Sequence, residues 1–218
     1  TRLALSEEDG KARDLLVQWM EEEDLTVIVD PIGNIFGVRE GTSPTLKPVL
    51  MGSHIDTVID AGIYDGAYGV LGALEVVRCL NEEGIETRHP LGVAAFTNEE
   101  GVRFQPDMMG SLVKCGGYPL EKAYERKDDD GVTVKDALKN IGYLGKGKID
   151  PEAYFELHVE QGPVLHKNGV DIGVVVGVQG IAWWRVAIHG QANHAGTTPL
   201  DMRKDPMAAA ADLYSGML

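Results

Sequence analysis

Helical and extended hydrophobic patterns alternate along the first forty residues. Residues 6–24 repeat apolar positions at helical spacing and predict an amphipathic helix. The apolar positions expected on its one face are Ala12, Leu15, Leu16, Trp19 and Met20. Ser6, with Asp9 three residues later, resembles a capping box and places the start of the helix. Two apolar runs, 25–30 and 35–40, flank a Pro-Ile-Gly-Asn turn and predict a hairpin.

Continuous apolar runs then alternate with a further helical pattern. Residues 47–53 and 91–98 are short apolar runs typical of buried strands, and residues 153–162 predict a third strand. Residues 67–81 predict a helix that is closed by Gly84. Buried strands separated by helices indicate an α/β fold, with a mostly parallel central sheet flanked by helices.

The pattern changes after about residue 176. Residues 181–190 alternate apolar and polar positions and predict a half-exposed antiparallel strand. Residues 205–216 predict the start of a helix. We therefore expect two domains: an α/β domain over residues 1–176 and the beginning of an incomplete α+β domain over residues 177–218.

Histidines and acids gather where the three predicted strands end. They are His54 and Asp56 after the first strand, Glu99 and Glu100 after the second, and His158 and Glu160 on the third. Because the carboxyl ends of parallel strands share one edge of a sheet, we expect these groups to converge with Asp65, which lies in a glycine-flanked turn. Alone, His54 is typical of a satisfied structural histidine, and Glu99 with Glu100 is typical of a solvated strand end. Their occurrence at three strand ends favours a metal site.

The spacing within the cluster adds chemical detail. Residues two apart in an extended chain point the same way, so the Asp56 side chain is expected to hydrogen-bond the far nitrogen of His54. Neighbouring Glu99 and Glu100 diverge, so one can ligate while the other faces a bound water. Imidazole and carboxylate ligands suit Zn²⁺, and also Mn²⁺, Co²⁺ or Ni²⁺. Two ions bridged by Asp65 would hold a water between them and lower its pKa.

Composition and charge exclude several partners. The 218 residues are enough for one large domain or a domain with part of another. A formal net charge of −14 argues against nucleic acid and against an anionic membrane surface. No apolar run approaches the roughly 18 residues of a membrane-spanning helix. Cys79 and Cys115 form no CxxC pair, so a reducing, cytoplasmic compartment is expected.

Four stretches of the chain carry a family resemblance. They are GSHIDTV…YDGAYGVLGALEV, FTNEEGVRF, ELHVEQGPVL and HGQANHAGTTPLDMRKDPMAAAA. Together they resemble N-carbamoyl-L-amino-acid hydrolases, allantoate amidohydrolases and β-ureidopropionases, a branch of the dinuclear-metal aminoacylase and carboxypeptidase superfamily. The match runs along nearly the whole chain. The wider superfamily often has a carboxylate where this chain has His158.

The resemblance implies a separate role for each residue of the cluster. By that resemblance His54 and His158 bind one metal ion, Glu100 binds the other, and Asp65 bridges the two. Glu99 would be the general base that activates the bridging water. The cofactors implied are therefore two divalent metal ions: Zn, Mn, Co or Ni.

Further roles are implied by the same resemblance. Asp56 would orient His54, and Gln161 would lie near metal and substrate. His194 would belong to a lid domain, reach into the partner subunit's site, contact the substrate there and stabilise the transition state. Residues 1–176 would then be the catalytic metal-binding domain, and residues after 176 the start of a lid and dimerisation domain. The full-length protein would be a homodimer.

The implied reaction is hydrolysis of the linear amide or ureido C–N bond of an N-carbamoyl amino acid or allantoate, releasing ammonia and CO₂. An aminoacylase or dipeptidase with the same core is the alternative within enzymes. A non-catalytic fragment that keeps the fold as an interaction module is the alternative outside them. The absence of a GxSxG motif argues against a serine nucleophile.

The two ends of the sequence lead us to expect a fragment, because it starts without methionine and stops inside a helical pattern. In the family that it resembles, the last metal-ligating histidine and an arginine that grips the substrate carboxylate would follow residue 218. His89, His166 and His189 offer no replacement for that histidine. If the polypeptide ends near residue 218, we expect at most one tightly bound ion and little activity.

Overall fold

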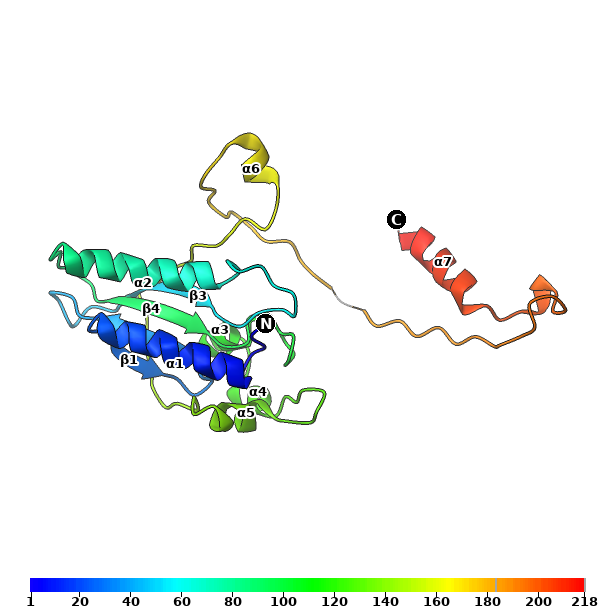
Figure 1. Ribbon diagram of the computed structural model, residues 1–218, viewed down its shortest axis with the longest axis horizontal. Helices are drawn as coiled ribbons and strands as arrows, with labels where there is room; N and C mark the ends of the chain where they lie inside the picture. Colours follow the sequence, from blue (N-terminus) through cyan, green and yellow to red (C-terminus); the bar gives the residue numbers. More distant parts are fainter. Residues whose placement is uncertain (183, 218) are drawn as a thin grey trace. The chain divides into compact units, whose positions relative to one another are not determined.

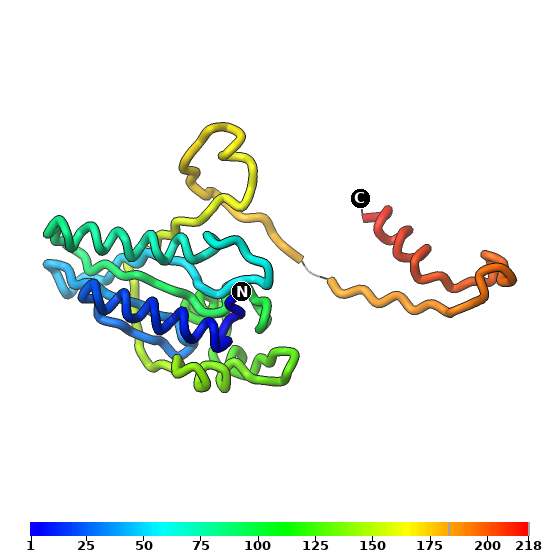
Figure 2. The backbone as a smooth tube through the Cα atoms, viewed as in Figure 1, coloured from blue at the N-terminus to red at the C-terminus, as the bar shows by residue number. Residues whose placement is uncertain are grey.

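The computed structural model describes residues 1–182 and 184–217. The chain divides into two compact units, Thr1–Val164 and Leu165–Leu218. Figures 1 and 2 colour the chain from its N-terminus to its C-terminus. The domain boundary expected after residue 176 stays a prediction, because a division into compact units does not show where a functional domain begins or ends.

A five-stranded sheet forms the centre of the first unit (Figure 1). Its strands are β1 (Thr26–Val29), β2 (Ile35–Arg39), β3 (Val49–His54), β4 (Leu91–Phe96) and β5 (Ala153–Phe155). Their order is β1-β2-β4-β3-β5, with parallel pairing in β4–β3 and β3–β5 and antiparallel pairing in β1–β2 and β2–β4. The expected α/β fold is confirmed. The sheet is mixed because the predicted hairpin, β1–β2, joins it at one edge.

Two long helices, α1 (Glu7–Glu22) and α2 (Ala67–Glu82), pack on one face of the sheet. Figure 1 shows both running alongside the strands. They share one apolar core with the sheet, which includes Leu16, Met20, Val70, Leu74, Val77, Ile35 and Val93. The opposite face carries a smaller cluster formed by Phe36, Leu50 and Ala94. The main apolar core therefore lies between the two helices and the face of the sheet that includes β3 and β4.

Helix α1 begins as predicted, and four of the five apolar residues expected on its buried face (Ala12, Leu16, Trp19 and Met20) lie in the core or pack against it. The Ser6 side chain accepts a hydrogen bond from the Asp9 backbone N–H at 3.2 Å, which is half of a capping box. The Asp9 carboxylate accepts from the Leu5 N–H instead of closing the box. The prediction that Leu15 is on the buried face is wrong, because its side chain is exposed. The buried face contains a charged pair, Asp9 with Arg13, whose atoms lie 2.8 Å apart.

Helix α2 lies close against the end of β3. A Cβ on Gly69 would come within 2.5 Å of the Leu157 carbonyl and 2.8 Å of Ser53 Cβ, so the helix approaches where only glycine fits. Gly84 ends the helix with a φ of +62°, as the sequence predicts. Helix α2 is therefore held against β3 near its first turn and ends at Gly84.

Strand β5 is shorter than predicted. It pairs with β3 only from Ala153 to Phe155, so the prediction that His158 belongs to this strand is wrong. Tyr154 and Phe155 are exposed, as expected at the edge of a sheet and not in its interior. His158 lies three residues beyond the last paired residue, where the chain leaves the ladder.

Three short helices follow β4 in the first unit. They are α3 (Met109–Lys114), α4 (Leu120–Tyr124) and α5 (Val134–Asn140). Residues of α4 and α5, including Ala123 and Leu138, are buried in the main core. Helix α3 matters for the site, because its first residues bond to the chain just after β4.

The second unit contains α6 (Val164–Asn168), which starts at the junction, the 3₁₀ turn η1 (Leu200–Met202) and α7 (Pro206–Met217). The helix predicted from residue 205 is confirmed. The strand predicted over residues 181–190 is wrong for its described part, and Trp183 lies outside the described residues. A strand needs a partner for its backbone groups, and the described residues of this unit offer none. No helix in the described part of the chain is long and apolar enough to cross a membrane.

Candidate metal centre

His54 is the last residue of β3 and is buried, with 2% of its surface exposed. Its Nδ1 lies 2.9 Å from the backbone carbonyl of Asp56. A carbonyl only accepts, so Nδ1 carries a proton, and in the neutral ring Nε2 has the free lone pair. That Nε2 faces two carboxylates, at 3.7 Å from Asp65 Oδ1 and 3.5 Å from Glu99 Oε2. The ring is therefore held in the tautomer that a metal ligand needs.

His158 mirrors this arrangement from the other side of Asp65. Its Nδ1 lies 2.8 Å from the Val159 carbonyl, so in the neutral ring the lone pair is on Nε2. This Nε2 lies 3.3 Å from Asp65 Oδ1, the same oxygen that His54 faces. The other Asp65 oxygen accepts a hydrogen bond from Gln161 Nε2 at 2.6 Å. One carboxylate oxygen therefore stands between two imidazole lone pairs.

A second group contains both neighbouring glutamates. His54, Glu99 and Glu100 each offer a ligand atom, and these atoms lie within 4.8 Å of one another. The first group, His54 with Asp65 and His158, meets the same limit. The sequence predicts this convergence, although the two glutamates lie three and four residues beyond the end of β4. Their roles as ligand and base stay predictions.

The Asp56 carboxylate does not hold His54 in the way that the sequence predicts. Its Oδ1 lies 3.8 Å from His54 Nδ1, beyond hydrogen-bond range, and the ring is held by the Asp56 backbone carbonyl. The two carboxylate oxygens accept instead from the N–H groups of Glu99 at 3.1 Å and Glu100 at 3.2 Å. Strand β3 ends at His54, so residues 54 and 56 do not keep the side-chain alternation of a strand. Asp56 thus joins both halves of the cluster through its backbone and its side chain.

The electrostatics of the cluster favour a cation. Burial raises the pKa of Asp56, Glu99 and Glu100 above the ordinary carboxyl value. At Glu100 the neighbouring negative charge of Asp65 raises the pKa further. The positive charge of a protonated His54 would oppose this shift at all three. A divalent ion among these groups would favour their charged forms and supply the missing counter-charge.

The surroundings of one carboxylate oxygen show whether the residues fit a metal ion. Glu100 Oε1 is buried and has no hydrogen-bond partner, and an unpaired buried carboxylate oxygen is unfavourable. Gly66 leaves space beside the His54 ring. Its φ is +60°, and a Cβ there would lie 2.5 Å from His54 Nε2, the atom that faces the carboxylates. The cluster thus combines two imidazoles that turn Nε2 toward one carboxylate oxygen, crowded carboxylates and an unsatisfied oxygen. This donor set fits Zn²⁺ or a similar divalent ion.

The remaining predicted site residues divide between the two units. Gln161 reaches the cluster through its bond to Asp65, in a backbone conformation with φ of +51°. His194 belongs to the second unit, where its Nδ1 accepts from the N–H groups of Gly196 and Thr197. That bond fixes the ring within a local turn. A role for His194 at the site stays a prediction.

Glu156 is a neighbour of the cluster that the sequence interpretation missed. Its carboxylate accepts from Ser53 Oγ at 2.6 Å and from the Tyr154 hydroxyl at 2.7 Å. Ser53 directly precedes His54, so this contact ties the segment after β5 to the end of β3. Its position two residues before His158 in an extended segment was the signal that could have identified it.

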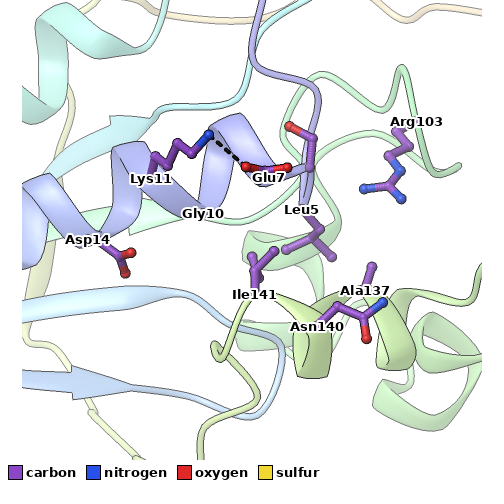
Figure 3. A pocket seen from close by; sticks show the side chains of 10 residues that line it. Leu5, Glu7, Gly10, Lys11, Asp14, Arg103, Ala137, Asn140 and Ile141 are labelled. Atoms are coloured by element: carbon purple, nitrogen blue, oxygen red, sulfur yellow. Dashed lines mark ion pairs between the residues drawn. The ribbon is translucent and has the colours of Figure 1, made fainter.

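A cavity of about 380 Å³ adjoins the cluster. Glu99, Glu156 and His158 belong to its lining, and most of the remaining wall is apolar or aromatic, including Phe36, Phe96, Met108 and Tyr154. A larger cavity, of about 630 Å³, lies between α1 and α5. Figure 3 shows its lining, with the Lys11–Glu7 ion pair at one side, and none of the candidate ligands takes part in it.

The fold and the cluster define a class: an α/β protein with a histidine and carboxylate centre at the carboxyl end of its sheet. The family model that matches residues 50–216 is that of peptidase family M20/M25/M40. This chain belongs to that family.

Individual relatives give the comparison more detail. The chain is 44% identical to an N-carbamoyl-L-amino acid amidohydrolase of Geobacillus stearothermophilus, over 98% of this chain and 54% of the relative. It is 42% identical to a probable allantoate deiminase of Oryza sativa subsp. japonica, over 97% of this chain and 45% of the relative. Among solved structures, a hydantoinase/carbamoylase family amidase from Burkholderia ambifaria matches with a TM-score of 0.80 at 44% identity, over 98% of this chain and 53% of that one. The chain thus spans about half the length of these relatives.

Proposed function

We propose that the protein carrying this chain is a metal-dependent amidohydrolase of N-carbamoyl amino acids or of a related ureido acid such as allantoate. The observation that carries the proposal is the convergence of His54 Nε2 and His158 Nε2 on one oxygen of Asp65. Family membership and the printed names of the relatives support the choice of reaction. The net reaction consumes one water: hydrolysis breaks one C–N bond of the ureido group, the resulting carbamate loses its other C–N bond as it decomposes, and the products are the free amine, CO₂ and ammonia.

His54, Asp65 and His158 would hold one divalent ion, and Asp65 with Glu100 would contribute to a second. When bound, such ions polarise a carbonyl and lower the pKa of water. Within the described residues, Asp65 and Glu100 leave the second ion short of a third protein ligand, which catalytic sites normally have. Zinc, manganese, cobalt and nickel all suit this donor set.

Glu99 is our candidate for the general base. Its carboxylate lies 3.5 Å from His54 Nε2, and about one third of its side chain is exposed, so it can meet both water and substrate. Burial raises the pKa of Glu99 toward neutral pH. A carboxylate with a raised pKa accepts a proton from water more readily and can then donate it as an acid. Glu99 would take a proton from water and deliver it to the departing nitrogen. Asp56 would fix the direction of Glu99 by accepting from its N–H.

The substrate is expected to be small. The cavity of about 380 Å³ beside Glu99 and His158 lies within the size range of small-molecule sites. Gln161 would contact the substrate, and its hydrogen bond to Asp65 supports this role. A net charge of −14 makes the chain an unsuitable partner for nucleic acid.

Three further proposals concern the whole protein. Residues after 176 would begin a lid and dimerisation domain, so that the enzyme works as a homodimer. His194 would contact the substrate in the partner subunit's site. A cytoplasmic location is proposed because Cys79 and Cys115 are free and exposed, a state that a reducing compartment preserves.

The test is an activity assay on the whole polypeptide after metal removal and reloading. N-carbamoyl-L-amino acids and allantoate are offered in parallel with N-acetyl amino acids and dipeptides, and the release of ammonia or of free amine is measured. We expect turnover of a ureido substrate that is lost with a chelator and restored by Zn²⁺, Mn²⁺, Co²⁺ or Ni²⁺. Turnover confined to N-acetyl amino acids or dipeptides would replace this proposal with an aminoacylase or dipeptidase. A metal-loaded protein without any turnover would contradict it.

A further inference from the structure

The segment Thr97–Glu100 carries Glu99 but belongs to no helix or strand. It follows β4 directly, and Asn98 within it has a φ of +53°, a conformation that residues other than glycine rarely adopt. A segment of this kind cannot satisfy its own backbone groups, so partners must come from elsewhere in the fold. Those partners fix the backbone of Glu99 and therefore the position from which its side chain extends.

Two side chains receive the N–H groups of this segment. The Asp56 carboxylate accepts from Glu99 and Glu100, as described above. At the other end, the Thr97 N–H donates to Asn34 Oδ1 at 2.9 Å. The segment is therefore clamped at its end by Asp56 and at its beginning by Asn34.

Asn34 is completely buried and joins three parts of the fold. Besides accepting from Thr97, its Nδ2 donates to the Gly110 carbonyl at 3.0 Å and to Asp30 Oδ2 at 2.8 Å. Only a side chain that both donates and accepts can make these bonds, so the carboxamide is matched to the position. The Gly110 N–H also donates to the Thr97 carbonyl at 2.8 Å.

The junction has no room for another arrangement. A Cβ on Gly110 would lie 2.2 Å from Asn34 Oδ1 and 2.5 Å from the Thr97 nitrogen. The backbone of α3 thus presses the Asn34 carboxamide against the start of the segment. A further contact, from Arg13 Nη2 to Thr97 Oγ1 at 3.3 Å, holds the threonine side chain but leaves its N–H to Asn34.

We propose that Asn34 is a positioning residue: its carboxamide fixes the backbone of Thr97–Glu100 and thereby aims the Glu99 carboxylate at His54 and Asp65. This inference rests on the proposed function, in which Glu99 is the general base. Asn34 itself touches neither the candidate ligands nor the cavity beside them in any contact described above. Its effect on the reaction therefore passes through Thr97.

Asn34→Ala is the first test, and Asn81→Ala is its matched control. Asn81 also donates to a carbonyl and a carboxylate, both of Glu23, and accepts from one N–H, that of Arg39. It lies in α2, away from the segment. In the metal-loaded whole polypeptide we expect Asn34→Ala to lower kcat by about 10²-fold, the order expected for a misplacement of roughly 1 Å. KM should stay within about twofold, and Asn81→Ala should leave kcat per folded molecule unchanged.

Two readouts besides activity accompany this comparison. Hydrogen exchange of the Thr97 amide should accelerate in Asn34→Ala and not in Asn81→Ala, because only the first removes its acceptor. The tightly bound metal content should match that of the wild type, since His54, Asp65 and His158 keep their own contacts. A role that is only structural would lower stability in both variants without separating them in kcat or in exchange at Thr97.

A double exchange guards against a variant that fails to fold. Asn34→Asp places a second carboxylate beside Asp30 and should lose kcat. Adding Asp30→Asn restores a donor–acceptor pair between the two positions and keeps an acceptor for the Thr97 N–H, but the Gly110 carbonyl stays without its donor. We therefore expect the double variant to regain part of the lost kcat, and a double variant no more active than Asn34→Asp would contradict the positioning role.

The outcomes separate this inference from the proposed function. If Asn34→Ala keeps kcat within about threefold of the wild type, or if Asn81→Ala loses as much, the positioning role is refuted. Unchanged exchange at Thr97 in Asn34→Ala refutes it even where activity falls. If the wild-type protein hydrolyses no ureido substrate, the proposed function fails, and the exchange measurement still decides whether Asn34 holds the segment.

Discussion

Gly66→Ala is expected to damage the metal centre more than it damages the fold. Gly66 has a φ of +60°, and an added Cβ would lie 2.5 Å from His54 Cε1, Nε2 and the His54 carbonyl oxygen. The left-handed backbone alone costs an L-residue about 1–2 kcal/mol. Carbon atoms pack at roughly 3.5–4.0 Å, so the imidazole has to move by about 1 Å.

That displacement is large on the scale of metal coordination. Ligand distances in a working site vary by about ±0.2 Å, so a shift of about 1 Å removes His54 from the coordination shell. We therefore expect loss of the tightly bound ion and of turnover. Titration of the purified protein with Zn²⁺ by calorimetry measures the first, and ammonia release from an N-carbamoyl amino acid measures the second.

Gly84→Ala is the matched control for this prediction. Gly84 has nearly the same φ, +62°, but an added Cβ would meet nothing within 4 Å. Gly84→Ala should lose about 1–2 kcal/mol of unfolding free energy in urea denaturation from its left-handed backbone alone, and Gly66→Ala should lose more, because its Cβ also meets the backbone carbonyl of His54. Only Gly66→Ala should lose metal. Equal metal affinity in the two variants would show that the Gly66 clearance does not serve the His54 ring.

Three further predictions concern the base, the buried ion pair and pH. Glu99→Gln should keep bound metal and lose about 10²- to 10⁴-fold in turnover, and near-normal turnover would exclude Glu99 as the base. Arg13→Ala leaves Asp9 charged and buried, and should lower the free energy of unfolding by about 3–5 kcal/mol in urea denaturation; a loss below about 1 kcal/mol would contradict this. The raised pKa of Glu100 means that the metal-free folded state binds its proton more tightly than the unfolded state does. Metal-free protein should therefore lose stability as pH rises from the unfolded carboxyl value through the raised one, and bound metal should reverse that slope in thermal scans.

The local chemistry of the sheet explains what the sequence could predict. The runs at β3 and β4 are continuous and apolar because both strands are central, and the turn after β1 carries its own signal in Gly33, whose φ is +83°. Such patterns can be recognised from the local sequence, without knowledge of tertiary contacts. The convergence of His54, Asp65 and the two glutamates then follows from the shared carboxyl edge of the sheet.

What the sequence could not predict depends on tertiary partners. The pattern that runs on past Phe155 looks like a strand, but β5 is paired only along Val49–Met51, so the chain is free to turn before His158. Asp56 keeps its place at the cluster but bonds backbone N–H groups that lie 43 and 44 residues away in sequence. Neither partner is visible in a window of neighbouring residues.

Buried polar groups are the other source of difference. Asp9 and Arg13 occupy the core face of α1, where a hydrophobic pattern leaves no place for charges. Their burial makes sense only with Gly33 and Thr97, which accept hydrogen bonds from Arg13. For the same reason the local sequence predicts Asn34 only as part of a turn, since its partners Thr97 and Gly110 lie far away in the sequence.

Anomalous diffraction from crystals of the zinc-loaded whole polypeptide tests the central claim most directly. The account predicts a zinc peak within about 2.0–2.2 Å of His54 Nε2, His158 Nε2 and an oxygen of Asp65. It also predicts that the peak disappears from a His158→Ala crystal grown under the same conditions. A tightly bound zinc located elsewhere, or a peak that survives His158→Ala unchanged, would contradict it.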